Sequence, residues 1–158
     1  MSNAHALRTP RAPSLVQLLN PLISRLLGIG MPFGPNVLMT VVGRTSGVAR
    51  TFPVAILELD GRRFVQSPFG EVNWVRNLRA AGEAVVVRGG SQEPVGAAEL
   101  APEAAGRIFQ EALAPYLRSR VGAAILGRTF GVRRDSTAED FVALARRHPM
   151  FELVGRQA

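Results

Sequence analysis

The residues of this chain that could do chemistry gather in one short segment, Val41–Pro53, which has the sequence VVGRTSGVARTFP. An apolar run ends there in the hydroxyl pair Thr45 and Ser46. Arg44 and Arg50 flank the turn. Guanidinium groups, hydroxyls and backbone N–H groups bind phosphate when a turn brings them to one point. The segment therefore favours an anionic cofactor or nucleotide, and an ordinary basic hairpin tip in water is the alternative.

A second informative segment is Ser67–Gly82, with the sequence SPFGEVNWVRNLRAAG. Its first four residues predict the end of a strand and a loop, and a helix follows. That helix carries the only tryptophan, Trp74, and Asn77 on roughly the same side. We expect the loop to flank a planar ligand and the helix to wall the pocket, whereas a packed core aromatic is the alternative role for Trp74.

Other catalytic motifs are absent from the sequence. It has no Walker motif, no G-x-G-x-x-G and no nucleophile elbow. It has no cysteine, and its two histidines, His5 and His148, lie far apart in the chain, so we expect no metal site. An enzyme built on these residues needs a cofactor to supply the difficult chemistry.

Composition limits the partners. All 19 basic residues are arginine, and the net charge of +7 favours phosphates, carboxylates or acidic lipid. Aromatic residues are few and do not alternate with the arginines, so we expect no nucleic-acid partner. The sequence shows neither a signal peptide nor an apolar run of membrane-spanning length, and the absence of cysteine suits the cytoplasm.

The elements that must position these residues follow from the hydrophobic pattern. Residues 1–13 predict a flexible arm, in which 1–4 are consistent with a cloning remnant, and residues 14–158 predict a single domain. Asp60-Gly61 predicts a tight hairpin, and Ser136 with Glu139 predicts a capping box. We expect helices over 14–27 (kinked at Pro21), 73–81, 102–114, 115–126 and 136–147, and strands over 37–42, 51–59, 63–67, 84–88, 94–100 and 150–154. This order predicts an α+β barrel.

Taken together, GRTSGVARTFPV and NWVRNLRAAG resemble the deazaflavin-dependent nitroreductase family. The family's hairpin is similar to T-x-G-R-K/T-S/T-G-x-x-R-x-x-P, and its helix is similar to W-x-x-N-L-x-A. The resemblance covers residues 37–88 well and residues 91–147 in outline, and His148-Pro149-Met150-Phe151 fits the family's closing His-Pro-x-Phe.

The resemblance implies a fold and an activity. The fold is a split β-barrel of the FMN-binding-like type, with about six antiparallel strands, an N-terminal helix, an inserted helix and a C-terminal helical segment. The activity is an oxidoreductase that passes hydride from a reduced 5-deazaflavin coenzyme of the F-420 type to a quinone, an enone or a nitro compound. Many family members have lysine where this chain has Thr45, and the tyrosines that some place near the substrate reduce here to Tyr116.

Carried over position by position, the resemblance also implies site residues. The phosphate would be held by Arg44, Thr45, Ser46, Gly47 and Arg50. The ring would meet Pro53, Val54, Ala55, Val65, Gln66 and Ser67, with Trp74 and Asn77 shaping the pocket. Ser67 is the candidate catalytic residue. From the apolar pattern we expect the substrate to meet Met31, Phe33, Tyr116 and Phe130.

The residues leave one main alternative open, a barrel that binds FMN, haem or a fatty acid without deazaflavin turnover. The sequence allows a monomer or a homodimer. It also allows weak association with a membrane surface, because the segment over 14–27 is amphipathic and carries few charges.

Overall fold

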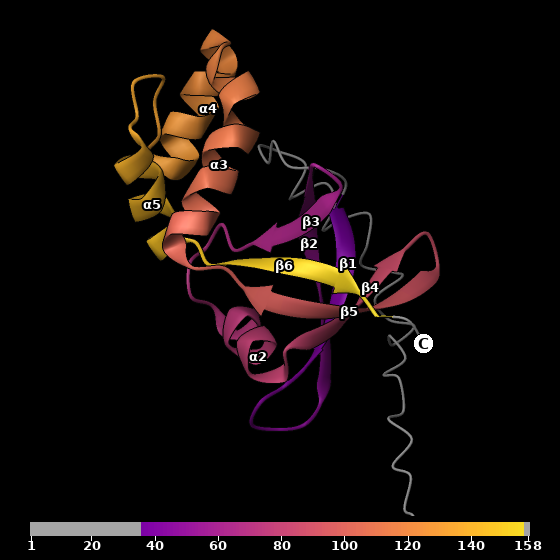
Figure 1. Cartoon of the computed structure of the whole chain (residues 1–158). Helices are drawn as coiled ribbons and strands as arrows, with labels where there is room; N and C mark the ends of the chain where they lie inside the picture. Colours follow the sequence, from indigo (N-terminus) through magenta and orange to yellow (C-terminus); the bar gives the residue numbers. More distant parts are fainter. Residues whose placement is uncertain (1–35, 157–158) are drawn as a thin grey trace, which may run out of the picture.

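The computed structural model describes residues 36–156; the arm over 1–13, the helix expected over 14–27, Met31 and Phe33 lie outside the described residues. The described part forms six strands and four helices (Figure 1). The strands are β1 (Asn36–Val42), β2 (Ala49–Leu59), β3 (Arg62–Gln66), β4 (Glu83–Arg88), β5 (Ser91–Glu99) and β6 (Met150–Gly155). The helices are α2 (Asn73–Ala81), α3 (Pro102–Leu117), α4 (Arg120–Phe130) and α5 (Ala138–Arg147).

The strands close into an antiparallel barrel in the order β1-β2-β3-β6-β5-β4, which confirms the expected α+β barrel of six strands. The predicted turn at Asp60-Gly61 joins β2 to β3, and both residues have positive φ, 51° and 73°. Asparagine, aspartate and glycine tolerate that conformation better than other residues, which is why this dipeptide closes a tight hairpin.

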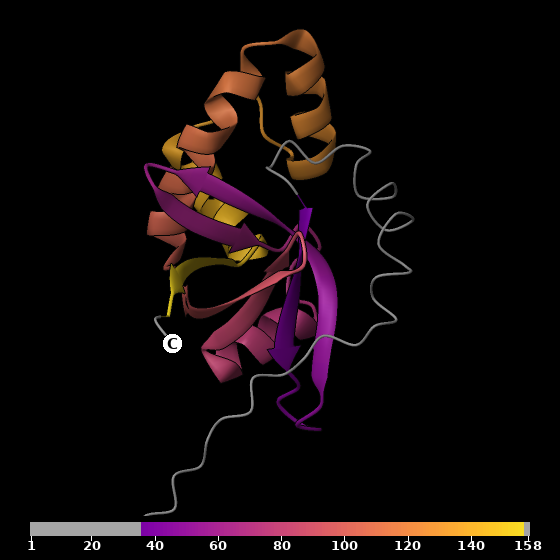
Figure 2. The same ribbon diagram turned by 90° about the vertical axis from the view of Figure 1, so that its right-hand side faces the viewer.

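Alternate strand residues divide the apolar side chains between two clusters. The barrel interior contains Val41, Val54 and Val65, and α2 contributes Val75 and Leu78 to it. The outer face of β2 and β3 carries a second cluster, which α3, α4 and α5 cover at one end of the molecule (Figures 1 and 2). Its largest buried members are Phe64, Phe109, Leu113, Leu126, Leu144 and Met150.

Two helix boundaries differ from the sequence prediction. Helix α3 continues through Pro115 to Leu117. Pro115 lacks the N–H for one intrahelical hydrogen bond, but it does not end the helix. The break comes at Ser119, whose Oγ accepts a hydrogen bond from the Gly122 N–H at 2.9 Å and caps α4.

The capping box of α5 also differs from the prediction of Ser136 and Glu139. Thr137 Oγ1 accepts from the Asp140 N–H at 3.3 Å, and Asp140 Oδ2 accepts from the Thr137 N–H at 2.7 Å. Ser136 is not free for this role, because its Oγ accepts from the Arg133 N–H at 2.9 Å and closes the preceding loop.

Candidate functional site

The loop over 43–48, between β1 and β2, is a tightly built turn. The Gly43 N–H donates to the Val48 carbonyl and the Gly47 N–H donates to the Gly43 carbonyl, both at 2.9 Å. Gly47 has a φ of 66°, and a Cβ at Gly43 would lie 2.9 Å from Ser46 Oγ. Side chains at either glycine would strain the turn, so the sequence G-R-T-S-G fixes its shape locally.

Helix α2 holds this turn from behind. Asn77 is only 7% exposed, and its Oδ1 accepts from the Arg44 backbone N–H at 3.2 Å and from Arg44 Nη1 at 2.8 Å. The predicted pocket residue Asn77 and the predicted phosphate residue Arg44 are therefore brought into direct contact. Asn77 orients a cation without neutralising it, because an amide carries no charge.

The outer side of the turn is polar and cationic. Arg44, Thr45, Ser46, Gly47 and Arg50 are all exposed. Within residues 36–156, neither Arg44 nor Arg50 forms an ion pair. The structure thus brings all five predicted phosphate residues to one end of the barrel, with their charge uncompensated by a described carboxylate.

The predicted ring residues lie on the neighbouring stretches of β2 and β3. Val54 and Val65 point into the barrel interior and are 6% and 0% exposed, so only their backbone is available to a ligand. The registered pair Ile56–Val65 puts Ala55 and Gln66 opposite each other, one step along the two strands. Gln66 is 6% exposed, and its Oε1 has no hydrogen-bond partner among the described residues.

Ser67 is committed to the turn that follows β3. Its side chain is fully buried, and its Oγ donates to the Gly70 carbonyl at 2.6 Å. Its backbone N–H donates to the Pro149 carbonyl at 3.0 Å. Because the hydroxyl proton already serves the turn, this geometry favours a structural role for Ser67 and argues against a role as proton donor.

His148 holds the same turn, and the sequence analysis gave it no role beyond the closing His-Pro motif. Its Nδ1 lies 2.9 Å from the Ser67 carbonyl oxygen, and its ring meets Phe130 edge-on at 5.3 Å. Burial lowers the pKa of His148, and the hydrogen bond to Ser67 only partly opposes that effect. A neutral His148 with its proton on Nδ1 donates to this carbonyl, and the His-Pro pair was the signal that could have identified the contact.

The turn presents an exposed aromatic ring. Phe69 is 74% exposed, whereas Gly70 next to it has a φ of 74° and would place a Cβ 3.2 Å from the Arg147 carbonyl. A large apolar side chain held in water by a rigid turn contributes little to the fold. Phe69 is therefore a candidate contact for the planar ligand that the sequence analysis expects beside this loop, although that analysis did not name Phe69.

Trp74 packs mainly into the barrel. Its ring stacks on Phe52 at 5.4 Å with an interplanar angle of 25°, and it meets Phe151 at 6.4 Å. It lies against the interior cluster and is only partly exposed. These contacts are those of a core aromatic that supports α2 behind the hairpin.

The predicted substrate residues Tyr116 and Phe130 lie in the helical layer, and Phe130 adjoins the predicted ring residues: it shares a buried cluster with Ala55 and meets His148, which lies against Ser67. Tyr116 is 41% exposed near the end of α3, and Phe130 is 3% exposed inside the helical cluster. Helices α3, α4 and α5 lie at the end of the molecule opposite the β1–β2 turn in both views (Figures 1 and 2). These two residues are thus separated from the predicted phosphate site by the barrel.

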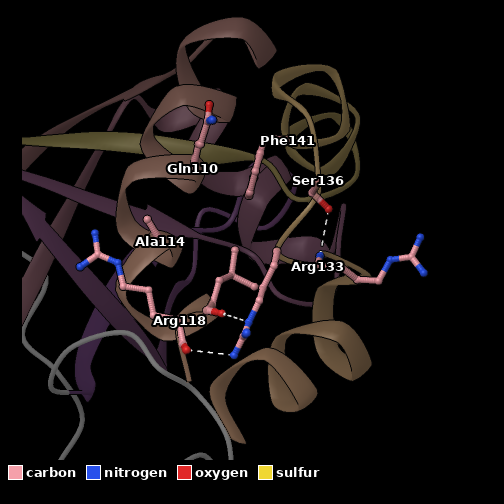
Figure 3. A pocket seen from close by; sticks show the side chains of 8 residues that line it. Gln110, Ala114, Arg118, Arg133, Ser136 and Phe141 are labelled. Atoms are coloured by element: carbon pink, nitrogen blue, oxygen red, sulfur yellow. Dashed lines mark hydrogen bonds between the residues drawn. The ribbon is translucent and has the colours of Figure 1, made fainter. Parts of the chain in front are cut away.

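A hollow of about 440 Å³ lies in the helical layer (Figure 3). It shares no residue with the predicted cofactor site. Its lining consists of Gln110, Ala114, Leu117, Arg118, Arg133, Arg134, Ser136 and Phe141. In the described part of the chain, no three acidic or histidine side chains gather as metal ligands, and none of α2 to α5 has the length and apolar composition that a membrane crossing needs.

The sequence matches the model of one protein family. The family model described as F420H(2)-dependent quinone reductase matches residues 23–134. No curated protein matches the sequence.

Several solved structures are similar in fold. One is an F420-H2 dependent reductase (FDR-A), 24% identical over 76% of this chain and 94% of that chain, with a TM-score of 0.46. Another is a putative pyridoxamine 5'-phosphate oxidase from Listeria innocua, 12% identical over 86% and 94% of the two chains, with a TM-score of 0.49. A third is an FAD-binding protein from Mesorhizobium loti, 10% identical over 92% and 91%, with a TM-score of 0.46.

Proposed function

We propose a cofactor site for this chain, which belongs to the F420H(2)-dependent quinone reductase family. The chain is an oxidoreductase of the split β-barrel type, and its cofactor is reduced F420. When bound, the reduced deazaflavin supplies a hydride to an electron-poor small molecule such as a quinone. The proposal is that the β1–β2 turn holds the cofactor phosphate and that the facing stretches of β2 and β3 hold its ring.

The turn fits a phosphate in charge and in donors. Arg44 and Arg50 are exposed and have no described carboxylate partner. The hydroxyls of Thr45 and Ser46 are exposed beside them. A guanidinium stays charged at every physiological pH and matches two phosphate oxygens at once. This uncompensated pair of arginines on a rigid turn is the observation that carries the proposal.

On the side of the predicted ring residues, one side-chain atom suits the deazaflavin ring. Gln66 Oε1 is buried without a hydrogen-bond partner, which costs free energy unless a donor arrives. The imide N–H of a deazaflavin is such a donor. We assign Gln66 to the ring edge, Ala55 to the strand position opposite it, and the exposed Phe69 to the rim where a planar acceptor would stack.

The protein's own contribution is then to position the cofactor ring and the acceptor ring. A hydride transfer needs two rings held in contact with water excluded, and it needs no nucleophile. Ser67 and His148 fix the turn that carries Phe69 through the hydrogen bonds to Gly70 and from His148 Nδ1. Because the Ser67 proton is used in that turn, we assign the proton that completes the reduction to solvent.

The finer partner predictions stay proposals. A hydrophobic quinone partitions into membranes, so we propose that the chain meets its acceptor at a membrane surface. Met31 and Phe33, outside the described residues, stay the predicted acceptor contacts. A cytoplasmic location, and a monomer or a homodimer, likewise stay predictions.

Direct ligand titration tests the site. The purified full chain is titrated separately with F420, FMN and haem, with deazaflavin or tryptophan fluorescence and haem absorbance as signals. We expect saturable binding of F420 and oxidation of reduced F420 by a soluble quinone. Binding of FMN or haem with no response to F420 would overturn the proposal in favour of a differently loaded binding protein.

A further inference from the structure

The corner between α3 and α4 exposes apolar side chains in a way that the cofactor site does not explain. Val121 is 72% exposed, Tyr116 41% and Ile125 39%. Three of the seven exposed large apolar side chains among the described residues therefore lie within ten positions of each other. The corner projects from the end of the molecule opposite the β1–β2 turn (Figures 1 and 2).

The same region is strongly basic. Residues 112–134 include five arginines and no aspartate or glutamate; the arginines are Arg118, Arg120, Arg128, Arg133 and Arg134. Among the described residues, the only ion pair made by these arginines joins Arg133 to Asp135 at 3.8 Å, where both side chains are more than 80% exposed. Exposed apolar side chains close in sequence to arginines that are mostly without an ion pair match a surface that is anionic outside and apolar beneath.

The corner is also built to keep its shape. A Cβ at Gly122 would lie 2.2 Å from the Tyr116 carbonyl oxygen, so no other residue allows this close approach. Arg134 closes the end of α3 from the facing loop, because its Nε and Nη2 donate to the carbonyls of Leu117 and Arg118 at 2.7 and 2.9 Å. A surface held rigid before contact loses little conformational entropy on binding.

The hollow in the helical layer adjoins this corner. Arg118 and Arg133 stand on opposite sides of it (Figure 3), and Arg134, which also lines it, donates to the Leu117 and Arg118 carbonyls. Its floor includes the apolar side chains of Leu117 and Phe141. A phosphodiester headgroup with an acyl chain beneath it has the chemistry that such a lining recognises.

We propose that the α3–α4 corner docks on an anionic phospholipid surface, with Val121 and Ile125 entering the headgroup region and the arginines contacting lipid phosphates. The docking surface is distinct from the proposed cofactor site and shares no residue with it. Docking there would leave the β1–β2 turn facing the aqueous side, because the two lie at opposite ends of the molecule.

Vesicle flotation tests the proposal with a matched pair of variants. The full chain is mixed with phosphatidylcholine vesicles, with and without phosphatidylglycerol. Val121→Asp is compared with Val154→Asp, which changes a 59% exposed valine on β6. We expect binding only to the anionic vesicles, at least a tenfold loss in Val121→Asp, and no loss in Val154→Asp.

Two arginine variants and an activity assay with a water-soluble quinone complete the test. Arg120→Glu should weaken vesicle binding, whereas Arg107→Glu, on the exposed middle of α3, should have a smaller effect. Reduction of a water-soluble quinone with reduced F420 should stay unchanged in Val121→Asp, so failure of docking and failure of the proposed function are distinguishable. Equal flotation of the two valine variants, binding to neutral vesicles alone, or capture by RNA or an acidic protein in place of vesicles would overturn the docking proposal.

Discussion

The arginines of β3, which we call the wall arginines, are paired with carboxylates of neighbouring strands. The arginines at the β1–β2 turn have no carboxylate partner among the described residues. On the wall, Arg62 donates to both Glu152 oxygens at 2.8 and 2.7 Å, and Arg63 donates to both Glu93 oxygens at the same distances. At the turn, the side-chain partner of Arg44 among residues 36–156 is the neutral amide of Asn77. Carboxylates therefore compensate the wall arginines, and no described carboxylate compensates Arg44.

The difference shows that the arginines of this chain must be compared by their partners and not only by their number. The wall pairs join β3 to β6 and β3 to β5, and the hydrogen bonds from Arg62 and Arg63 lower the pKa values of Glu152 and Glu93. Each pair is partly exposed and satisfies its own charges. An arginine without such a partner keeps its full affinity for an incoming anion.

The largest expected effect comes from Arg50→Ala. Loss of a hydrogen bond to a charged group is worth roughly 1.5–3 kcal/mol, so F420 affinity should fall by about tenfold or more. Melting temperature should change little, because Arg50 is exposed and has no described ion pair. Fluorescence titration measures the affinity.

Arg62→Ala is the matched control for that experiment. It removes one arginine from the same barrel but from a wall pair with Glu152. We expect F420 affinity close to that of the unaltered protein. An Arg50→Ala protein that is folded and binds F420 normally would show that the turn does not hold the phosphate.

A substitution at Asn77 can give Arg44 a carboxylate partner like those of the wall arginines. Asn77→Asp places a carboxylate at the position that accepts from Arg44 Nη1 at 2.8 Å. The new ion pair should compete with the cofactor phosphate and lower F420 affinity by about fivefold, a loss of roughly 1 kcal/mol typical of a partly exposed charge pair. Asn73→Asp makes the same charge change at the exposed first residue of α2, one helical turn before Asn77, where no hydrogen bond to Arg44 is formed. Equal losses in both variants would mean that net charge alone explains the effect.

A smaller gain is expected from Thr45→Lys, which adds the cation that the resembling family commonly has. F420 affinity should rise about two- to threefold at low salt, because an added exposed charge is worth a few tenths of a kcal/mol. The gain should shrink as salt screens it. Titrations at two salt concentrations measure this, and a neutral result at low salt would place Thr45 away from the phosphate.

The smallest expected effect is a loss of folding stability at acid pH that comes from the two wall carboxylates, Glu93 and Glu152. Folding lowers the pKa values of Glu93 and Glu152 from their ordinary value of 4.5, so the unfolded chain binds more protons in the window just below it. The stability from these pairs is complete above pH 4.5 and is lost as the pH falls through the lowered pKa values. Melting temperatures from pH 6 to pH 3 should fall less steeply in Glu93→Gln than in the unaltered protein. Identical slopes in the two proteins would contradict the wall assignment.

Local chemistry was enough to predict the hairpin, the strands and the α2 region. Asp60-Gly61 permits the positive φ values that close β2 on β3, and the glycines on either side of Arg44 permit the turn through contacts within residues 43–48. Alternation of apolar residues assigned the strands, although β2 begins two residues earlier than expected, at Ala49, where pairing with Val42 extends the ladder. The choice between Ser136 and Thr137 as the α5 cap was beyond the sequence pattern, because both residues suit the role and a loop contact decides between them.

By itself, therefore, the sequence determined which segments are strands and helices and which residues could bind an anion, since these depend on neighbours along the chain. Only the tertiary structure decided what those residues face. Closure of the barrel puts β6 between β3 and β5, which pairs Arg62 with Glu152 across 90 positions, and packing of α2 brings Asn77 to Arg44 across 33. The same packing buries Ser67 on Gly70 and leaves Gln66 Oε1 without a donor among residues 36–156. Charge compensation and burial depend on contacts between residues far apart in the chain, and for that reason no local pattern encodes them.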